Sequence, residues 1–213
     1  MSVFPEPDIT IARRISRALQ AEDFPATADW SAAPVLRFFS DWRGANPDPR
    51  LETEVRVLWS PTVLYLHFTA KYRTITVFAD SEPNGRRDQM WDRDVAEAFL
   101  QPPGSDPRSY KEFEVSPNGL WIDLDISHGE KHDLRSGLRR RAAIDEAAKI
   151  WRAELAIPMT SLTSHLDPSV EWRANFYRVE GPAEPRFYYA WRPTMTSEPN
   201  FHVPEAFGRL HFV

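Results

Sequence analysis

Apolar and polar residues alternate with a period of two along the middle of the chain, as they do in half-buried β-strands. The pattern is strongest in three segments, 90–100, 110–115 and 120–126. In the first segment Glu97 shares a face with Phe99, so a carboxylate projects among apolar side chains. Acidic and aromatic groups therefore extend from a sheet face that a simpler protein would make plainly polar. We interpret this stretch as the place to look for a binding face.

Further segments with the same alternation, separated by turn residues, predict more strands. They lie at 54–59, 63–70, 74–78, 139–144, 149–157, 171–180, 187–191 and 208–213. Residues 11–20 fit a short helix, although Ile9 and Ile11 fit an edge strand equally well, and residues 158–162 suggest one helical turn. Strands and helices do not alternate, which argues against a parallel sheet. The sequence therefore predicts an all-β fold, an antiparallel β-sandwich of jelly-roll type with little helix.

The proline content and the lack of a linker bear on domain organisation. The chain has 213 residues, with 19 prolines against 8 glycines, and proline is poorly tolerated inside helices and central strands. Many short elements joined by stiff turns are therefore expected. No flexible linker divides the sequence, so we expect a single domain over residues 1–213, in which residues 1–50 form a wrapping N-terminal segment.

Charge and cysteine content remove several classes of function. The formal net charge of −5 argues against nucleic acid as a partner. The chain has no cysteine, which excludes disulfides, zinc–thiolate sites and cysteine nucleophiles, and fits either cytoplasm or periplasm. No apolar run is long enough to span a bilayer. Residues 1–20 lack the long apolar stretch of a signal peptide, so a cytoplasmic location is expected unless a leader was removed.

Two groups of residues resemble a known family. The first is Trp91-x-x-Asp94-x-x-Glu97-x-Phe99, followed by Tyr110-x-Glu112-Phe113 and Asn175-Phe176-Tyr177-Arg178; the second is Ala190-Trp191-Arg192-Pro193 with Phe201-His202-Val203-Pro204-Glu205-x-Phe207-Gly208-Arg209-Leu210. Together they resemble carbohydrate-binding family 9 over about residues 50 to 213. The resemblance implies a β-sandwich that grips the reducing end of a glucan or xylan chain and clamps a sugar between two tryptophans. It also implies structural calcium, a frequently secreted or periplasmic location, and no cleavage by the module itself.

The resemblance further implies roles for particular residues. Trp91 and Glu97 stand where the family motif places a clamp tryptophan and a sugar-binding carboxylate, and Trp191 is the candidate for the second tryptophan. Glu114 falls where the family uses an arginine, so the charge is reversed at that position. The predicted ligand-binding set is Trp91, Glu97, Glu114, Arg178, Trp191 and His202.

These residues also have purely structural interpretations. Trp91 fits a plug at the end of the sandwich as well as it fits a stacking platform. Glu97 fits an ion pair with Arg178 or Arg173, because an unpaired buried charge is costly. His202 fits a contact with a loop carbonyl as well as a bond to a sugar hydroxyl.

No metal site is predicted, and calcium stays an alternative. The loop Asp80–Gly85 partly resembles a calcium loop, with oxygen donors at alternate positions before a glycine. Trp91 stands where the later glutamate of such a loop is expected, which favours a plain turn. His128 and His132 are four residues apart, but Gly129 lies between them where no helix is expected, so a metal pair is not predicted.

The leading hypothesis is non-catalytic carbohydrate binding, with an oligo- or polysaccharide as the partner and a role in polysaccharide breakdown. A glycoside hydrolase is the alternative, because such an enzyme needs a carboxylic acid and a second carboxylate across a cleft. The carboxylates available for it are Glu97, Glu112, Glu114 and Asp123. Two further alternatives are a haem scaffold ligated by Met90 and His202, and a sandwich that serves protein contacts alone.

Overall fold

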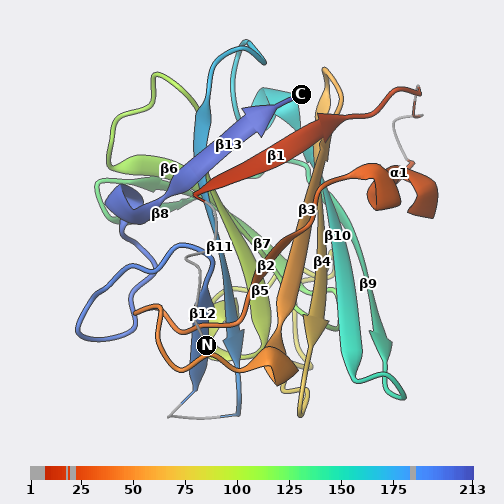
Figure 1. The fold of residues 1–213 in the computed structure, drawn as a ribbon, viewed down its shortest axis with the longest axis vertical. Helices are drawn as coiled ribbons and strands as arrows, with labels where there is room; N and C mark the ends of the chain where they lie inside the picture. The colour runs from red at the N-terminus through yellow and green to blue at the C-terminus, as the bar shows by residue number, and fades with distance from the viewer. Residues whose placement is uncertain (1–7, 18, 20–22, 183–185) are drawn as a thin grey trace.

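The computed structural model describes residues 8–17, 19, 23–182 and 186–213. Within that part of the chain, strands hydrogen-bond into one 13-stranded sheet that curls over on itself (Figure 1). The strands are β1 (Ile9–Arg14), β2 (Leu36–Phe38), β3 (Thr53–Trp59), β4 (Val63–Lys71), β5 (Val95–Gln101), β6 (Ser109–Val115), β7 (Trp121–Ser127), β8 (Glu130–Asp133), β9 (Arg139–Asp145), β10 (Ile150–Pro158), β11 (Trp172–Glu180), β12 (Phe187–Ala190) and β13 (Gly208–Phe212). The helical elements are α1 (Thr27–Ala32) and the 3₁₀ turns η1 (Pro49–Leu51), η2 (Met90–Asp92), η3 (Met159–Ser161) and η4 (Pro204–Ala206). No helix in the described ranges is long and apolar enough to cross a membrane.

The strand order confirms the predicted β-sandwich class. Along the sheet it is β8-β7-β6-β5-β11-β13-β1-β3-β4-β10-β9, while β12 pairs with β11 and β2 pairs with β3. The predicted strands at 54–59 and 63–70, and those at 139–144 and 149–157, form the antiparallel pairs β3–β4 and β9–β10. The three segments of the strongest alternation become β5, β6 and β7, which are neighbours in the sheet.

The first strand departs from the prediction. β1 is neither a helix nor an edge strand, because it lies inside the sheet and is parallel to both β13 and β3. The Arg209 amide donates to the Asp8 carbonyl at 2.7 Å, and the Val213 amide donates to the Ala12 carbonyl at 2.9 Å. Figure 1 shows β1 and β13 side by side across the upper part of the molecule. Two parallel pairings, one with the last strand β13 and one with β3, therefore enter an otherwise antiparallel sheet.

Residues 74–78 form no strand, contrary to the pattern. The Thr76 amide donates to the carboxylate of Asp94 at 3.0 Å, and the Thr76 carbonyl accepts from the Asp94 amide at 2.9 Å. One neighbouring residue thus satisfies backbone groups that would otherwise pair in a sheet. Conversely, the alternation does not predict α1 or β8, because six and four residues are too few to show a period.

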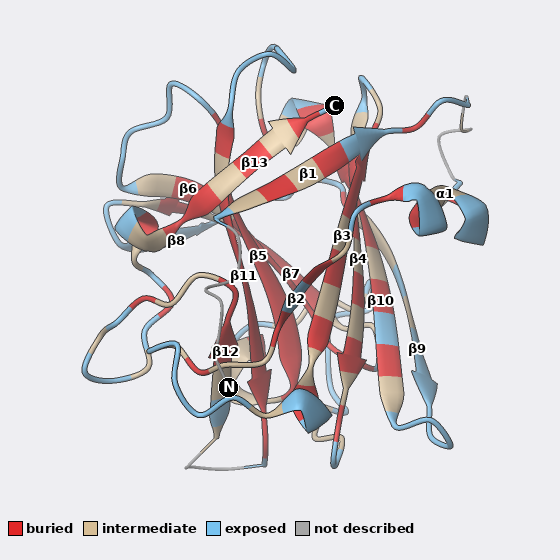
Figure 2. Cartoon of the chain, in the orientation of Figure 1, coloured by how far each residue is buried: buried red, intermediate tan, exposed pale blue. Residues whose placement is uncertain are grey.

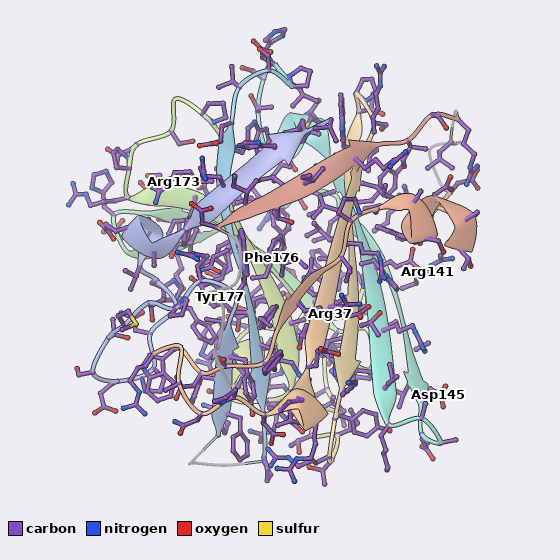
Figure 3. All side chains as sticks on the ribbon, viewed as in Figure 1. Arg37, Arg141, Asp145, Arg173, Phe176 and Tyr177 are labelled. Atoms are coloured by element: carbon purple, nitrogen blue, oxygen red, sulfur yellow. The ribbon has the colours of Figure 1, made fainter. Side chains whose placement is uncertain are left out.

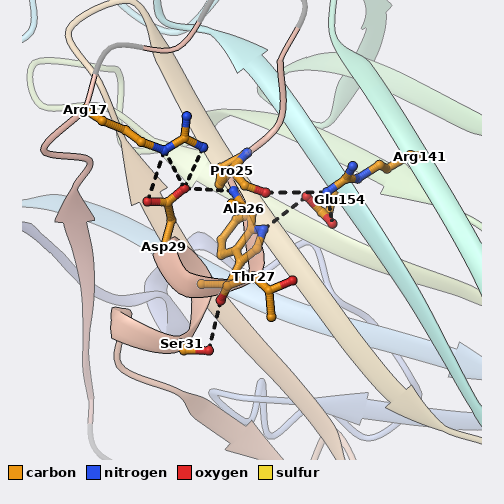
Figure 4. A network of polar contacts seen from close by, with 9 residues as sticks. Arg17, Pro25, Ala26, Thr27, Asp29, Ser31, Arg141 and Glu154 are labelled. Atoms are coloured by element: carbon orange, nitrogen blue, oxygen red, sulfur yellow. Dashed lines mark hydrogen bonds and ion pairs between the residues drawn. The ribbon is translucent and has the colours of Figure 1, made fainter.

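Polar contacts hold the short helix α1 against the sheet (Figure 4). Asp29 forms an ion pair with Arg17 at 2.8 Å. The buried Trp30 donates from Nε1 to Glu154 on β10 at 3.1 Å, and Glu154 also pairs with Arg141 on β9 at 2.7 Å. These contacts connect the N-terminal segment to β9 and β10.

The central strands are buried on both faces (Figure 2). Phe176 and Tyr177 are adjacent on β11 (Figure 3), yet Phe176 lies in the main core inside the curled sheet and Tyr177 lies in a second cluster on the other face. The second cluster consists of Met90, Val95, Phe99, Tyr110, Ile122, Leu124, Ile126, Tyr177, Val179, Ala190, Phe201 and Phe207. Phe201 stacks on Tyr177 with ring centroids 4.1 Å apart. The face that carries Glu97 is therefore an apolar layer covered by a loop, not a solvated sheet surface.

Candidate functional site

Trp91 lies in η2, where the loop 80–88 leads into β5. Gln89 adopts a left-handed φ of 55°, which turns the chain, and Met90 inserts into the second cluster with 1% exposure. The indole of Trp91 packs against the same cluster and remains partly exposed. The ammonium of Lys131 on β8 lies 3.9 Å from the indole centroid, in a cation–π contact.

Three buried glutamates, which we call the carboxylate cluster, lie beside this indole. Glu97 on β5 is directly opposite Glu114 on β6, and Glu112 is two residues from Glu114 on the same face. Glu97, Glu112 and Glu114 are 3%, 2% and 0% exposed, and one oxygen of each lies within 4.8 Å of the others. Burial raises the pKa of all three carboxyls, and the negative charges of the other two raise the pKa of Glu114 further.

His202 approaches the cluster from the loop that follows β12. Its ring stacks on Phe99 with centroids 5.4 Å apart, and its Nδ1 lies 2.6 Å from the hydroxyl of Tyr110. Burial lowers the pKa of His202 to about 4, so the ring is neutral near pH 7. Nδ1 is also 3.8 Å from Oε2 of Glu112, but a neutral ring at that distance forms neither an ion pair nor a hydrogen bond. When Tyr110 donates to Nδ1, the ring proton lies on Nε2, which is then a donor for a ligand.

One pocket of about 230 Å³ lies beside these side chains, and Glu97 and Glu112 line it whereas the predicted ligand residue Glu114 does not. Of the predicted residues, Trp91, Glu97 and His202 line it together. Tyr188 on β12 and Asn200 in the loop also line it. The pocket thus combines aromatic rings with carboxylate acceptors and N–H donors, which suits a small ligand with an apolar face and several hydroxyls.

Sequence patterning did not single out Tyr188 or Lys131. Tyr188 is opposite Val179 on β11, and Tyr177, two residues earlier on that strand, is opposite Glu97. Strand register therefore places Tyr188 on the face that carries Glu97. The alternation of apolar and polar residues does not reveal which residues of two paired strands lie opposite each other, so it could not predict this position. Lys131 belongs to the short strand β8, which lies in a charged segment without apolar alternation.

The structure does not fit Trp191 as the candidate for the second tryptophan of a sugar clamp. Trp191 is 1% exposed and lies in the main core. Its ring is 5.8 Å from that of Phe176, and it covers Gly208 so closely that a Cβ there would lie 2.5 Å from Cη2. The indole of Trp191 therefore has no face open to a sugar, whereas Tyr188 occupies the pocket side of the same segment.

Arg178 is also removed from the site. It is 0% exposed, its Nη2 lies 3.5 Å from Oε2 of Glu180, and its Nη1 donates to two backbone carbonyls. It lies on the opposite face of β11 from the residue that pairs with Glu97, so the predicted ion pair between Arg178 and Glu97 is wrong. Arg173, the other predicted partner of Glu97, donates instead to Gln101 at 3.2 Å.

The loop Asp80–Gly85 gathers no carboxylates for a cation. Asp80 lies 3.7 Å from Arg87, and Glu82 lies 3.9 Å from Arg86. Among the residues that the structure describes, the carboxylate cluster is the single set of three acidic or histidine side chains close enough to share an ion.

The carboxylates do not face one another across a cleft. The members of the carboxylate cluster project side by side from one face of β5 and β6. Asp123 lies on the other face of β7, where it accepts from the Ser136 amide at 2.7 Å. A glycosidase needs an acid and a second carboxylate about 5–9.5 Å apart on two sides of the scissile bond, which this arrangement does not provide. Met90, the other half of the suggested haem ligand pair with His202, packs in the second cluster and does not line the pocket.

A curled β-sandwich with a small aromatic and acidic pocket on its outer face is the arrangement to compare with known proteins. Residues 41–212 match carbohydrate-binding family 9, and the chain belongs to this family.

Solved structures share the fold. The crystal structure of a candidate carbohydrate-binding protein from Bacteroides uniformis superposes with a TM-score of 0.76 at 18% identity, over 96% of this chain and 99% of that chain. A family 9 module from Caldicellulosiruptor kristjanssonii was solved in complex with glucose and with cellotriose. Its two structures give TM-scores of 0.66 and 0.65 at 14% identity, over 96% of this chain and 95% and 93% of those chains.

A relative is also found by sequence. An extracellular protein of Arthroderma benhamiae is 24% identical over an alignment of 201 residues that covers 86% of this chain and 87% of that protein.

Proposed function

We propose that this protein is a non-catalytic carbohydrate-binding module that holds one sugar unit in the pocket beside Trp91. The observation that carries the proposal is the convergence of Trp91, Glu97 and His202 on a single pocket of about 230 Å³. That volume is below the roughly 300–1,000 Å³ of sites for drug-sized ligands, so it suits a single ring better than a chain segment. The family 9 module solved with glucose and cellotriose supports a sugar as the ligand.

The aromatic walls of the site are Trp91 and Tyr188. An indole face stacks on the apolar C–H face of a pyranose. Lys131 covers the indole from the exposed strand β8, and a cation–π contact at such a site is worth only about 0.5–1 kcal/mol, so a sugar ring displaces it at small cost. Tyr188, and not Trp191, then forms the second aromatic wall of the pocket.

The polar groups bind the sugar hydroxyls. Glu97 is an acceptor, and His202 Nε2 and the Asn200 amide are donors. Each bond replaces one to water and nets only about 0.5–1.5 kcal/mol, so we expect affinities from roughly micromolar to millimolar.

Isothermal titration calorimetry with glucose, cellotriose and xylotriose tests the proposal. The native protein is expected to bind at least one of them, Trp91→Ala to lose at least tenfold in affinity, and Trp91→Phe to keep most of it because it retains a ring face. Asp145→Asn, an exposed change at the tip of β9, is the control and is expected to bind normally. No response to any neutral sugar, or an unchanged response in Trp91→Ala, contradicts the proposal.

The non-catalytic half of the proposal has its own assay. Because the members of the carboxylate cluster project side by side from one sheet face and do not flank a cleft, incubation with aryl glycosides is expected to release no phenol above a protein-free blank. Release that disappears in Glu97→Gln would establish a hydrolase instead.

A further inference from the structure

A larger hollow adjoins the sugar pocket, and we call it the arginine groove. It lies between the segment 41–50, Arg73 and residues 186–189, and its volume is about 780 Å³. The Trp42 amide donates to the Tyr188 carbonyl at 3.2 Å, which joins the segment to β12. Tyr188 and Arg186 border both the groove and the sugar pocket. Because the two share a wall, and the groove is within the roughly 300–1,000 Å³ of small-molecule sites, a ligand held in the pocket can continue into the groove.

The groove presents aromatic rings to a ligand. Trp42 is partly exposed and packs edge-on against Tyr188, with ring centroids 6.2 Å apart. Phe187 is 42% exposed, the highest value for an aromatic side chain in the part of the chain that the structure describes. Rings of this kind stack on the apolar face of a pyranose, as Trp91 is expected to do in the pocket. The groove therefore fits further sugar units better than it fits an extended peptide.

A guanidinium lies over each of these rings. The distances from the guanidinium carbon to the ring centroid are 4.7 Å for Arg43 and Trp42, 4.1 Å for Arg73 and Phe187, and 5.6 Å for Arg186 and Tyr188. A cation–π contact at an exposed site is weak, so a guanidinium can leave the ring for a stronger partner. The strongest partner for a guanidinium is a carboxylate, which accepts two parallel N–H···O bonds.

The groove is positive although the chain as a whole is negative. Four arginines, the fourth being Arg50, border it against two aspartates, which leaves a net charge of +2, whereas the chain carries −5. Asp48 is occupied by Arg50 at 2.8 Å. Asp41 accepts from two backbone amides and from the Asn46 amide at 2.7 Å.

Two of the arginines retain capacity for a ligand. The ion pair of Arg43 with Asp41 is long, at 3.6 Å, and exposed pairs of this kind contribute little. Arg73 forms no ion pair with a carboxylate of the described residues, and its guanidinium lies over Phe187. Charge complementarity therefore calls for an anionic group on the ligand.

We propose that the arginine groove binds a uronate, a sugar unit that carries a carboxylate, on the same glycan chain whose end lies beside Trp91. The inference rests on the proposed function and names its ligand class: an acidic glycan in place of a neutral one. The pyranose ring stacks on Phe187 or Trp42, and its carboxylate accepts from the guanidinium of Arg73 or Arg43. The neutral end unit occupies the pocket, and Tyr188 lies between the two sugars.

Isothermal titration calorimetry with a matched pair of ligands tests the groove. The pair is xylotriose and a xylotriose that carries glucuronic acid on its non-reducing unit. In 50 mM sodium chloride the native protein is expected to bind the acidic ligand about tenfold more tightly. The preference is expected to vanish when the acid is converted to its methyl ester, and to shrink in 500 mM sodium chloride, because salt screens exposed charges. Both comparisons use the native protein and so do not depend on how a variant folds.

Variants locate the preference. Arg73→Gln and Arg43→Gln are each expected to reduce it at least threefold. The control is Arg152→Gln, an exposed arginine on β10 outside the groove, which removes the same charge and is expected to keep the preference. An equal loss in Arg152→Gln would show that net charge alone is responsible and would overturn the site. Hexaglutamate that binds as tightly as the acidic sugar would show a peptide site instead.

The same titrations separate this inference from the proposed function. If the native protein binds both xylotriose ligands with equal affinity, the groove is rejected and the sugar pocket stands. If the acidic ligand binds through Arg73 and affinity is unchanged in Trp91→Ala, the pocket is rejected and the groove stands. If neither ligand binds, both are rejected.

Discussion

His67 on β4 lies beneath the indole of Trp30, with ring centroids 5.0 Å apart. Burial is the largest cause that lowers the pKa of His67 to about 4. The charged groups around it are Arg56 on β3, Arg152 on β10 and Arg141 on β9, which lower the pKa further, and Glu54 on β3, which raises it. The folded protein therefore keeps this imidazole neutral over a pH range in which the unfolded chain protonates it.

This residue predicts a pH dependence of folding. Between pH 6.5 and 4 the unfolded state binds more protons at His67, so stability falls as the pH falls, by up to about 3 kcal/mol. His67→Phe keeps a ring under Trp30 and cannot titrate, so its urea midpoint is expected to decline less over that window. Parallel declines in the two proteins would show that His67 is not the group responsible.

Arg178 and Glu180 form a buried ion pair, which we expect to stabilise the fold and not to bind a ligand. Arg178→Met leaves the carboxylate of Glu180 buried without its guanidinium, which is expected to cost about 3 kcal/mol or more in the free energy of unfolding. The double variant Arg178→Met with Glu180→Gln removes both charges and is expected to recover part of that loss. Denaturant titration measures the free energy of unfolding of both variants. If Arg178→Met had normal stability but lost sugar affinity, this would show that Arg178 takes part in sugar binding.

At the scale of the elements, alternation predicted most strands because side chains on a strand have only two faces. It predicted that Glu97 shares a face with Phe99, yet it did not show that both faces of β5 and β11 are buried. The pairing register of the strands decided which aromatic side chains reach the pocket and which reach the core. Tyr188 reaches the pocket and Trp191 the core because β12 pairs with β11 as it does, and that pairing depends on contacts distant in sequence.

The sequence did not predict that β1 is a central strand of the sheet. Residues 1–50 read as a wrapping segment, but β1 pairs on both sides, and Ala12 is fully buried in the main core. Deletion of residues 1–14 is expected to expose the edges of β13 and β3 and to give aggregation or a loss of cooperative unfolding. Thermal denaturation with light scattering measures this. Deletion of residues 1–7 alone spares β1 and is the control; equal behaviour of the two deletions would contradict a structural role for β1.

At the scale of the whole molecule, the site lies outside the curled sheet and not within it. The main core holds the sheet together, while the second cluster supports a loop that carries Asn200, Phe201 and His202 over the carboxylate cluster. The family accounts for the sandwich. Trp191 lies in the main core, which distinguishes this pocket from the tryptophan clamp that the resemblance implied.

The central claim is that a sugar is held against Trp91, and the indole N–H resonances of the 8 tryptophans test it most directly. The Trp91 resonance is identified by its absence from the nitrogen–proton correlation spectrum of Trp91→Phe. On titration with glucose or cellotriose, we predict that this resonance moves and saturates while that of Trp191 stays in place. A spectrum in which no indole resonance moves, or in which Trp191 moves and Trp91 does not, contradicts the account.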